Sequence, residues 1–377
     1  MKTRQVLIGC GIALVIVIIG AGALVFWLGK VVTSSTSGML KASPEMKQAG
    51  VRKGAGMFTK SVFLADPRLG QVSDIALGVL DRGRGFEIGI AGSAGAAFVS
   101  TTGSPKAFTS YGQSLDRARI IDVDNDGNCE FMNRGSWMSP VVLVGHKGNK
   151  LWEFGKQVDD AAPGDINGDG KLEFAVGFNG SGGVSLVNAQ GKELWNKPDG
   201  NVWHVEMVDA SGDGRLEILH SNAGGAATVR NARGDTVSQA RPTGYFSHFS
   251  VCSWPTSTDP LRCLSLDTGT VWVLNLDGSV AAKLAAPSCR MLGNVSGTPF
   301  EPQPGKPGYL AVLASYQQWN RSALWLFDSK KQLVYEEVLP ENCTALAALR
   351  LGSSQAETLL VGGNGTVTRY DFKGAKP

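Results

Sequence analysis

The chain has 377 residues, of which 43% are hydrophobic and 18% are charged, so a sizeable core is expected and wholesale disorder is excluded. The formal net charge of +3 is small and the basic residues are scattered, which argues against a nucleic-acid partner. The 49 glycines and 16 prolines lie between short runs of apolar residues. This mixture predicts many short strands joined by tight turns.

The N-terminal segment is uncharged and mainly apolar from Val6 to Gly29. About 20 apolar residues cross a bilayer, whereas the core of a signal peptide needs about 7–15. We therefore predict a transmembrane signal-anchor over residues 1–29, which would make this a single-pass membrane protein. Removal of the segment as a long signal peptide, cut within residues 31–38, is the alternative. Residues 30–56 are rich in Ser, Thr, Gly and Lys and lack periodicity, so they predict a flexible stalk.

A nine-residue motif recurs as DVDNDGNCE, DINGDGKLE and DASGDGRLE, beginning at Asp122, Asp165 and Asp209. The starts are 43 and 44 residues apart, a period that indicates a propeller or a solenoid. An apolar run, a glycine-rich turn and a second apolar run follow each loop without helical periodicity. The pattern predicts the four-stranded blade of a β-propeller.

Weaker copies of the unit extend the repeat in both directions. We count seven units, which begin near residues 75, 118, 162, 205, 247, 289 and 345. The last unit ends after its third strand, and residues 56–65 form one unpaired strand before the first unit. We therefore predict an all-β, seven-bladed β-propeller over residues 57–377, in which this N-terminal strand completes the last blade and closes the ring. An open solenoid is the alternative, but the sequence shows no polar caps for it.

The three Asp-rich loops place oxygen-bearing residues at alternate positions around a glycine at position 6. Calcium prefers six to eight oxygen ligands in such an arrangement. An EF-hand is excluded because its position 12 holds Asn133, Val176 or His220 instead of Glu. We predict up to three structural Ca²⁺ ions, with the residue at position 7 contributing its backbone carbonyl. The predicted ligands are Asp122, Asp124, Asp126, Asn128 and Glu130; Asp165, Asn167, Asp169, Lys171 and Glu173; and Asp209, Ser211, Asp213, Arg215 and Glu217.

The alternative for each loop is an Asp/Asn/Gly hairpin that caps its own backbone and binds no ion. Three copies in register, each with the same residue type at positions 1, 5, 6 and 9, favour the metal. An empty loop would also hold several carboxylates close together, which is costly without a cation.

These repeats resemble the FG-GAP/VCBS family, the calcium-loop propellers of integrin α subunits and many bacterial surface proteins. The motif is specific over residues 118–235 and degenerate in the other units, within a match of about residues 57–373. The resemblance implies a seven-bladed propeller with structural Ca²⁺ on one face and a role in adhesion or protein binding.

Five cysteines lie outside the first segment, and two of them flank the place where the fourth unit lacks its Asp loop. We predict that a Cys252–Cys263 disulfide replaces calcium in tying that hairpin, which would require an oxidising compartment. Two buried free thiols are the alternative.

Catalytic motifs are not evident in this sequence, and we predict that the protein is not an enzyme. The four histidines show neither metal spacing nor a nucleophile partner. Trp152 and Trp195 recur at one repeat position, which predicts packing between blades. The stretch GGVSLVNAQGKELW, residues 182–195, is similar to the repeat of pyrroloquinoline-quinone-type propellers. An envelope assembly scaffold, or a quinoprotein dehydrogenase, is therefore the alternative function.

The preferred function is a membrane-anchored binding or adhesion module. The propeller would face the periplasm or the cell exterior and bind a protein or a glycan there. This location suits the predicted Asp-rich loops, because extracellular calcium modules bind Ca²⁺ with typical dissociation constants of about 10⁻⁴–10⁻³ M and are filled at the millimolar Ca²⁺ found outside cells.

Overall fold

The computed structural model describes residues 44–77, 87–135, 138–242, 246, 248–254, 259–351 and 356–374. The chain divides into two compact units, Met1–Lys47 and Gln48–Pro377. The described part of the first unit is the one-turn helix α2 (Pro44–Lys47). Every described strand belongs to the second unit, together with two short 3₁₀ helices, η1 (Pro67–Leu69) and η2 (Gln317–Trp319).

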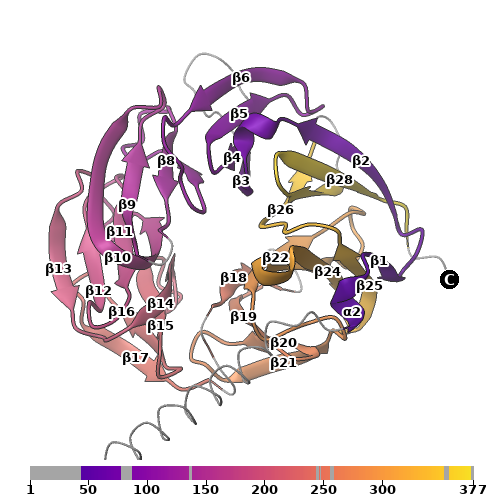
Figure 1. Ribbon diagram of the computed structural model, residues 1–377. Helices are drawn as coiled ribbons and strands as arrows, with labels where there is room; N and C mark the ends of the chain where they lie inside the picture. Colours follow the sequence, from indigo (N-terminus) through magenta and orange to yellow (C-terminus); the bar gives the residue numbers. More distant parts are fainter. Residues whose placement is uncertain are drawn as a thin grey trace, which may run out of the picture. The chain divides into compact units, whose positions relative to one another are not determined.

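The strands of the second unit form six antiparallel sheets arranged as a ring (Figure 1). Three sheets contain four strands that follow one another along the chain: β3 (Val72–Leu77), β4 (Ile88–Gly92), β5 (Gly95–Val99) and β6 (Pro105–Ser110); β14 (Val202–Val208), β15 (Glu217–Asn222), β16 (Ala227–Arg230) and β17 (Thr236–Ala240); and β18 (Ser250–Ser253), β19 (Leu261–Asp267), β20 (Thr270–Leu274) and β21 (Val280–Ala285).

The other three sheets depart from this simple order. A fourth has β26 (Ala345–Arg350), β27 (Glu357–Gly362), β28 (Thr366–Phe372) and the early strand β2 (Phe58–Ala65). A fifth has β22 (Asn294–Phe300), β23 (Tyr309–Tyr316), β24 (Arg321–Asp328), β25 (Leu333–Leu339) and, at its edge, β1 (Gly50–Lys53). The sixth has seven strands: β7 (Arg119–Ile121), β8 (Glu130–Asn133), β9 (Ser139–Val144), β10 (Lys150–Gly164), β11 (Glu173–Phe178), β12 (Val184–Val187) and β13 (Glu193–Lys197).

Burial follows the position of a strand in its sheet. The middle strands β4, β5, β15 and β16 are buried almost throughout, whereas the outermost strands β13 and β17 are largely exposed. The core therefore lies between neighbouring sheets. One of its clusters joins Ala175 and Leu186 to Val205 and Ile218 of the next sheet. Continuous apolar runs are typical of strands that are covered on both faces.

The two ends of the second unit meet in one sheet. Strand β2 pairs antiparallel with β28, from Phe58 opposite Phe372 to Ala65 opposite Thr366, with a register shift between Val62 and Leu64. This is the strand that the sequence predicted to pair with the end of the chain. The pairing satisfies the edge of β28, which would otherwise be left open.

The predicted set of seven four-stranded blades preceded by a transmembrane helix is wrong. The described residues form five separate sheets of four or five strands and one continuous sheet of seven. The difference arises in β10, whose first half pairs with β9 and whose second half pairs with β11, with register shifts near Phe154 and Val158. No turn interrupts this 15-residue strand, so the hydrogen bonds run on from one repeat unit into the next.

The membrane prediction is also corrected. No helix in the described residues is long and apolar enough to cross a membrane, against the predicted single-pass protein. The predicted signal-anchor, residues 1–29, lies outside the described residues.

Trp152 and Trp195 each form a hydrogen bond to the neighbouring repeat, in agreement with the contacts between blades that their recurrence predicted. The indole N–H of Trp152 donates to the Ala189 carbonyl at 2.9 Å, and that of Trp195 donates to the Ala232 carbonyl at 2.9 Å. Both carbonyls lie in the turn before the outermost strand of the following repeat. In the first turn, Gly191 packs directly on the Trp152 ring with a φ of 78°. A side chain there would collide with the indole.

We expect Gly191→Ala to destabilise the fold by about 2–4 kcal/mol, through left-handed backbone strain and displacement of the Trp152 ring. Gly180→Ala is the matched control, because Gly180 has a φ of 74° and no atom within 4 Å of an added Cβ. Its cost should be only about 1 kcal/mol. Equal losses in urea unfolding of the two variants would contradict the packing role of Trp152.

Candidate functional site

The three Asp-rich loops share one backbone conformation. Residues at positions 4 and 6 all have positive φ: Asn125 and Gly127, Gly168 and Gly170, and Gly212 and Gly214, with values from 58° to 87°. Glycine, and to a lesser degree Asn, adopts this conformation at little cost. The repeated glycines therefore specify the shape of the loops.

The Asp at position 1 organises each loop from within. Asp165 accepts the backbone N–H groups of Gly168, Asp169 and Gly170 at 2.7–3.1 Å. Asp209 accepts the equivalent three groups at the same distances, and Asp122 accepts those of Asp126 and Gly127. The Asp at position 5 accepts the N–H at position 7 in all three loops. These bonds are those of a self-capping turn.

The Glu at position 9 is the unusual member of each loop, because it is buried. Glu130, Glu173 and Glu217 begin β8, β11 and β15, and are 6%, 3% and 7% exposed. Burial, together with the charges of Asp124, Asp122 and Asp126, raises the pKa of Glu130 to about 7. Burial and the neighbouring Asp carboxylates also raise the pKa of Glu173.

The loops differ in how closely their ligands converge. Asp122, Asp124 and Glu130 each offer a carboxylate oxygen within 4.8 Å of the others, the one such triad of acidic, His or Cys groups found in the part of the chain that the structure describes. In the second loop the Asn167 amide donates to Glu173 at 3.0 Å, and in the third the Ser211 hydroxyl donates to Glu217 at 3.3 Å. Of the three loops, only the first brings three carboxylates together in the described residues, and its Asp126 is not part of that triad.

The predicted disulfide is not present. Cys252 and Cys263 are buried free thiols, and burial raises the pKa of Cys252 to about 12. Cys252 lies opposite Arg262 and Cys263 opposite Val251 in the β18–β19 pair. Directly opposed residues share a face, so the two thiols point to opposite faces of the sheet. The interpretation as two buried free thiols is the one that the structure supports.

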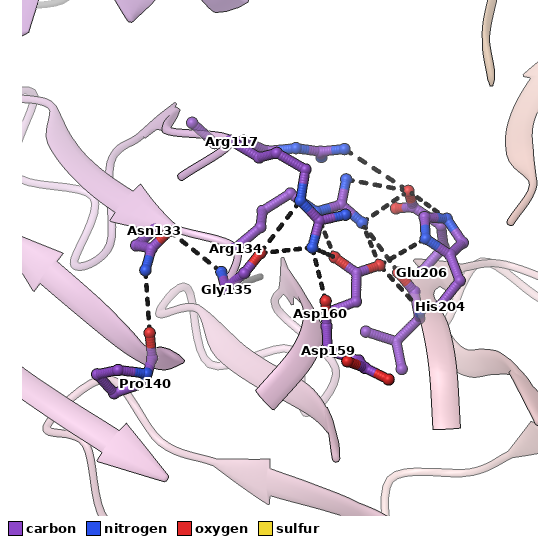
Figure 2. A network of polar contacts seen from close by, with 11 residues as sticks. Arg117, Asn133, Arg134, Gly135, Pro140, Asp159, Asp160, His204 and Glu206 are labelled. Atoms are coloured by element: carbon purple, nitrogen blue, oxygen red, sulfur yellow. Dashed lines mark hydrogen bonds and ion pairs between the residues drawn. The ribbon is translucent and has the colours of Figure 1, made fainter. Parts of the chain in front are cut away.

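A buried ion network lies at the inner strands of the ring (Figure 2). Asp160 in β10 is fully buried, and Arg134, just after β8, grips both its oxygens at 3.0 and 2.9 Å. His204 in β14 approaches the same carboxylate to 2.6 Å through Nδ1. Arg134 also donates to Glu206 in β14 at 3.2 Å. Four side chains, from β10, β14 and the segment just after β8, are thereby joined.

Arg117 completes the network from the side of β7. Its guanidinium donates to the carbonyls of Gly135 at 3.1 Å and Asp159 at 2.6 Å, and lies 3.3 Å from Asp160. The backbone of Arg117 has a φ of 52°, an unfavourable conformation for a non-glycine residue. Such strain is retained where the surroundings over-determine it.

The network sets its own protonation. Burial alone would raise the pKa of Asp160, but Arg134, His204 and Arg117 outweigh it and hold that pKa well below its usual range. The same kind of balance lowers the pKa of Glu206. For His204, burial opposes the charged form, yet Asp160 and Glu206 raise its pKa. Burial, His204 and Arg117 lower the pKa of His248 to about 4.

A cavity of about 410 Å³ adjoins this network at the centre of the ring. Its described lining comes from all six sheets or the loops beside them, and includes Gln71, Arg117, Trp203, His248, Asn294 and Thr344. A smaller cavity of about 100 Å³ shares five of these wall positions, Ser73 and Arg117 among them, and reaches Arg119, Arg134 and His204. We call the two together the axial cavity, and the smaller one its inner end.

The sequence analysis did not identify the axial residues, although a signal was present. Asp116, Asp160, His204 and His248 follow one another at intervals of 44 residues, the period of the Asp-rich loops. Equivalent positions of a propeller repeat lie around one axis. The change of residue type from Asp to His concealed the relation.

No protein-family model matches the chain, and no curated protein matches it. Among solved structures, BBS1N in complex with ARL6DN, soaked with mercury, matches with a TM-score of 0.56 and 13% identity, over 85% of this chain and 98% of that one. The same complex soaked with lead gives 0.53 and 14%, over 84% and 98%. The Pan2 WD40 domain of Neurospora crassa gives 0.50 and 12%, over 81% and 90%. These likenesses show the β-propeller fold, and the resemblance to FG-GAP/VCBS repeats stays a prediction.

We expect Asp160→Asn to reduce the free energy of unfolding by about 3 kcal/mol, because it leaves the buried Arg134 and His204 poorly compensated. The exposed pair Lys150–Glu153 provides the control, since its side chains are 49% and 56% exposed. Glu153→Gln should cost at most about 0.5 kcal/mol. Similar losses for both variants in urea unfolding would show that the axial network is solvated.

The pKa values of the two axial histidines, His204 and His248, should be shifted in opposite directions from the ordinary value of histidine. Histidine-selective NMR should give His248 a midpoint near pH 4 and His204 a midpoint above 6.5. The raised pKa of His204 stabilises the fold below pH 6.5, and this contribution is lost as pH rises through its folded pKa. The lowered pKa of His248 removes stability as pH falls from 6.5 towards 4. Midpoints near 6.5 for both residues would contradict the described network.

Proposed function

We propose that this chain is a propeller scaffold without catalytic activity, which binds a protein partner at the axial cavity. The single observation that carries the proposal is the composition of the cavity wall, to which all six sheets contribute. A site assembled in this way is positioned by the whole ring and not by one mobile loop. Pockets with a few convergent polar groups are the usual binding sites of a fold.

The chemistry of the wall suits recognition of a protein. Trp203 supplies an aromatic surface, and Gln71, Asn294 and Gln317 supply amide groups beside it. Aromatic residues dominate the binding energy of many protein interfaces, while amides fix orientation. One of the similar propellers, BBS1N, is described in complex with ARL6DN. That complex is consistent with a protein partner for a ring of this kind.

We further propose that the three Asp-rich loops hold structural Ca²⁺. The triad of Asp122, Asp124 and Glu130 fits a divalent cation, because each carboxylate can turn one oxygen to a common centre. In the second loop one oxygen of the buried Glu173 has no hydrogen-bond partner. A buried carboxylate oxygen without a partner is costly, and a cation would remove that cost. With its ion bound, each loop would hold together the two strands that it connects.

We expect millimolar Ca²⁺ to raise the midpoint of thermal unfolding by about 5 °C relative to EDTA, since an ion that binds only the folded state stabilises it. The double variant Asp169→Ala, Asp213→Ala should lose most of this shift. Asp277→Ala is the control, because Asp277 caps a surface turn outside the three loops. A shift of the same size in all three proteins, or none in the wild type, would leave the loops as plain turns.

A photo-crosslinking amino acid at Gln317, which lines the cavity and is exposed, should capture one discrete protein in the native cell. The same amino acid at Val237, on the outermost strand β17 and 54% exposed, is the matched control. With the captured protein purified, Trp203→Ala should weaken binding about tenfold or more. Identical adducts from both positions, or unchanged affinity of the variant, would contradict binding at the axial cavity.

A further inference from the structure

The inner end of the axial cavity is lined by cationic and neutral side chains. Three arginines, Arg117, Arg119 and Arg134, and two histidines, His204 and His248, line it. Ser73, Asn294, Ser296 and Thr344 line it as well. No carboxylate is found among the lining residues that the structure describes. The cavity surface thus presents positive charge although acidic residues are close by.

The acidic residues lie behind the arginines. Asp160 has no exposed side-chain surface, and Arg134 covers it with 8% of its own side chain exposed. Glu206 retains 17% exposure and sits between Arg134 and Arg119. Because these carboxylates are bonded to the guanidinium groups behind the wall, they do not line the inner end. The acidic residues that line the larger cavity, Asp116 and Asp159, are not part of the inner end.

Arg119 is the arginine with donors left for a ligand. The guanidinium of Arg134 donates hydrogen bonds to Asp160, Glu206 and the Val205 carbonyl, and that of Arg117 donates to two backbone carbonyls. Within the part of the chain that the structure describes, Arg119 forms one ion pair, to Glu206 at 3.6 Å, and 35% of its side chain is exposed. A guanidinium carries five N–H donors in a planar fork that suits a carboxylate or a phosphate.

The arginines of the cluster are crowded together with buried carboxylates. Arg117, Arg119 and Arg134 lie close to the carboxyl groups of Asp74, Asp159, Asp160 and Glu206. Burial and repulsion by Arg134 lower the pKa of Arg119, so its positive charge is held at a cost. An anion beside Arg119 would favour the charged form of that guanidinium, and the low polarity of the interior would strengthen the attraction.

We propose that the inner end of the axial cavity binds an anionic group of the size of a carboxylate or phosphate, contacted by Arg119. The volume of about 100 Å³ admits such a group but not a whole cofactor. The group is either a free anion or an acidic side chain of the proposed protein partner. Only that second source rests on the proposed function.

The probes are inorganic phosphate and succinate, titrated into the full chain at constant ionic strength. His204 and His248 line the inner end, so their ring signals in histidine-selective NMR report on the site directly. We expect saturable shifts of both signals and none of His146, which lies on an exposed turn. Arg119→Gln should weaken the apparent affinity about tenfold or more, as expected for the loss of a charged donor pair.

Arg350→Gln is the matched control. Arg350 is also partly exposed, at 54%, and pairs with Glu301 and Glu357 at 3.5 and 3.7 Å, but it lies outside the cavity wall. This variant should bind both probes as the wild type does. Absence of saturation by either probe, or equal weakening in Arg119→Gln and Arg350→Gln, would overturn the proposal.

A competition arm distinguishes the two sources. If phosphate displaces the purified partner and Arg119→Gln weakens binding of that partner, the partner supplies the anionic group. If the probes saturate the site without displacing the partner, the ligand is a free anion. A partner that binds in the absence of any probe binding would keep the proposed function and refute the anion site.

Discussion

The pairing of β2 with β28 is the constraint on which the rest of the propeller unit depends. It brings Phe58–Ala65 and Thr366–Phe372, which are about 300 residues apart, into one sheet and leaves the ring without a break at that place. A buried carboxylate reinforces the junction. Glu337 in β25 accepts the Tyr370 hydroxyl of β28 at 3.2 Å and the ammonium group of Lys60 of β2 at 2.6 Å. The closing sheet is thereby tied to its neighbour.

The axial network depends on the packing of the seven-stranded sheet against the sheet that contains β14. Asp160 and Arg134 would be costly to bury if either could swing towards water, since an incompletely paired charge in the interior destabilises a fold. The side chains that pair with Asp160 come from segments on either side of β10. Arg117 adopts an unfavourable backbone conformation where its guanidinium lies beside Asp160. Rigid neighbours keep this arrangement in place, and they also fix the wall of the axial cavity. We regard the network as a source of specificity for one arrangement of the inner strands, as buried polar groups are in some other proteins.

Local features of the fold could be predicted from the sequence, because they depend on a few adjacent residues. The DxNxDG pattern specifies its own loop through Asp165 and the glycines that follow it, whatever the rest of the chain does. The recurrence of Trp152 and Trp195 at one repeat position predicted the contacts between repeats, because equivalent residues of a repeat make equivalent contacts. The prediction of separate blades failed at β10, where continuity depends on register against two partners. The Cys252–Cys263 prediction failed because proximity along a hairpin does not place two side chains on one face.

The axial site was beyond the sequence analysis for a different reason. Its residues are of unlike types, and no local motif surrounds Arg134 or Asp160. Only the common 44-residue spacing of Asp116, Asp160, His204 and His248 relates them, and it becomes informative once the repeat is known to close around an axis. The charged groups of the axial site are therefore related by their equivalent positions in successive repeats, and not by a motif within one strand.

Disulfide trapping of the closing strands tests the central claim, a ring closed by its own ends, most directly. Ser61 lies opposite Arg369 in the β2–β28 pair, whereas Thr368 lies opposite Val62. Facing positions on paired strands bring two Cβ atoms within reach of a disulfide, and a shift by one residue turns them to opposite faces. The account predicts that the double variant Ser61→Cys, Arg369→Cys oxidises readily in the native protein and unfolds at a higher temperature, while Ser61→Cys, Thr368→Cys does not. Equal oxidation of the two pairs, or none in either, would contradict the closed ring and the axial site built on it.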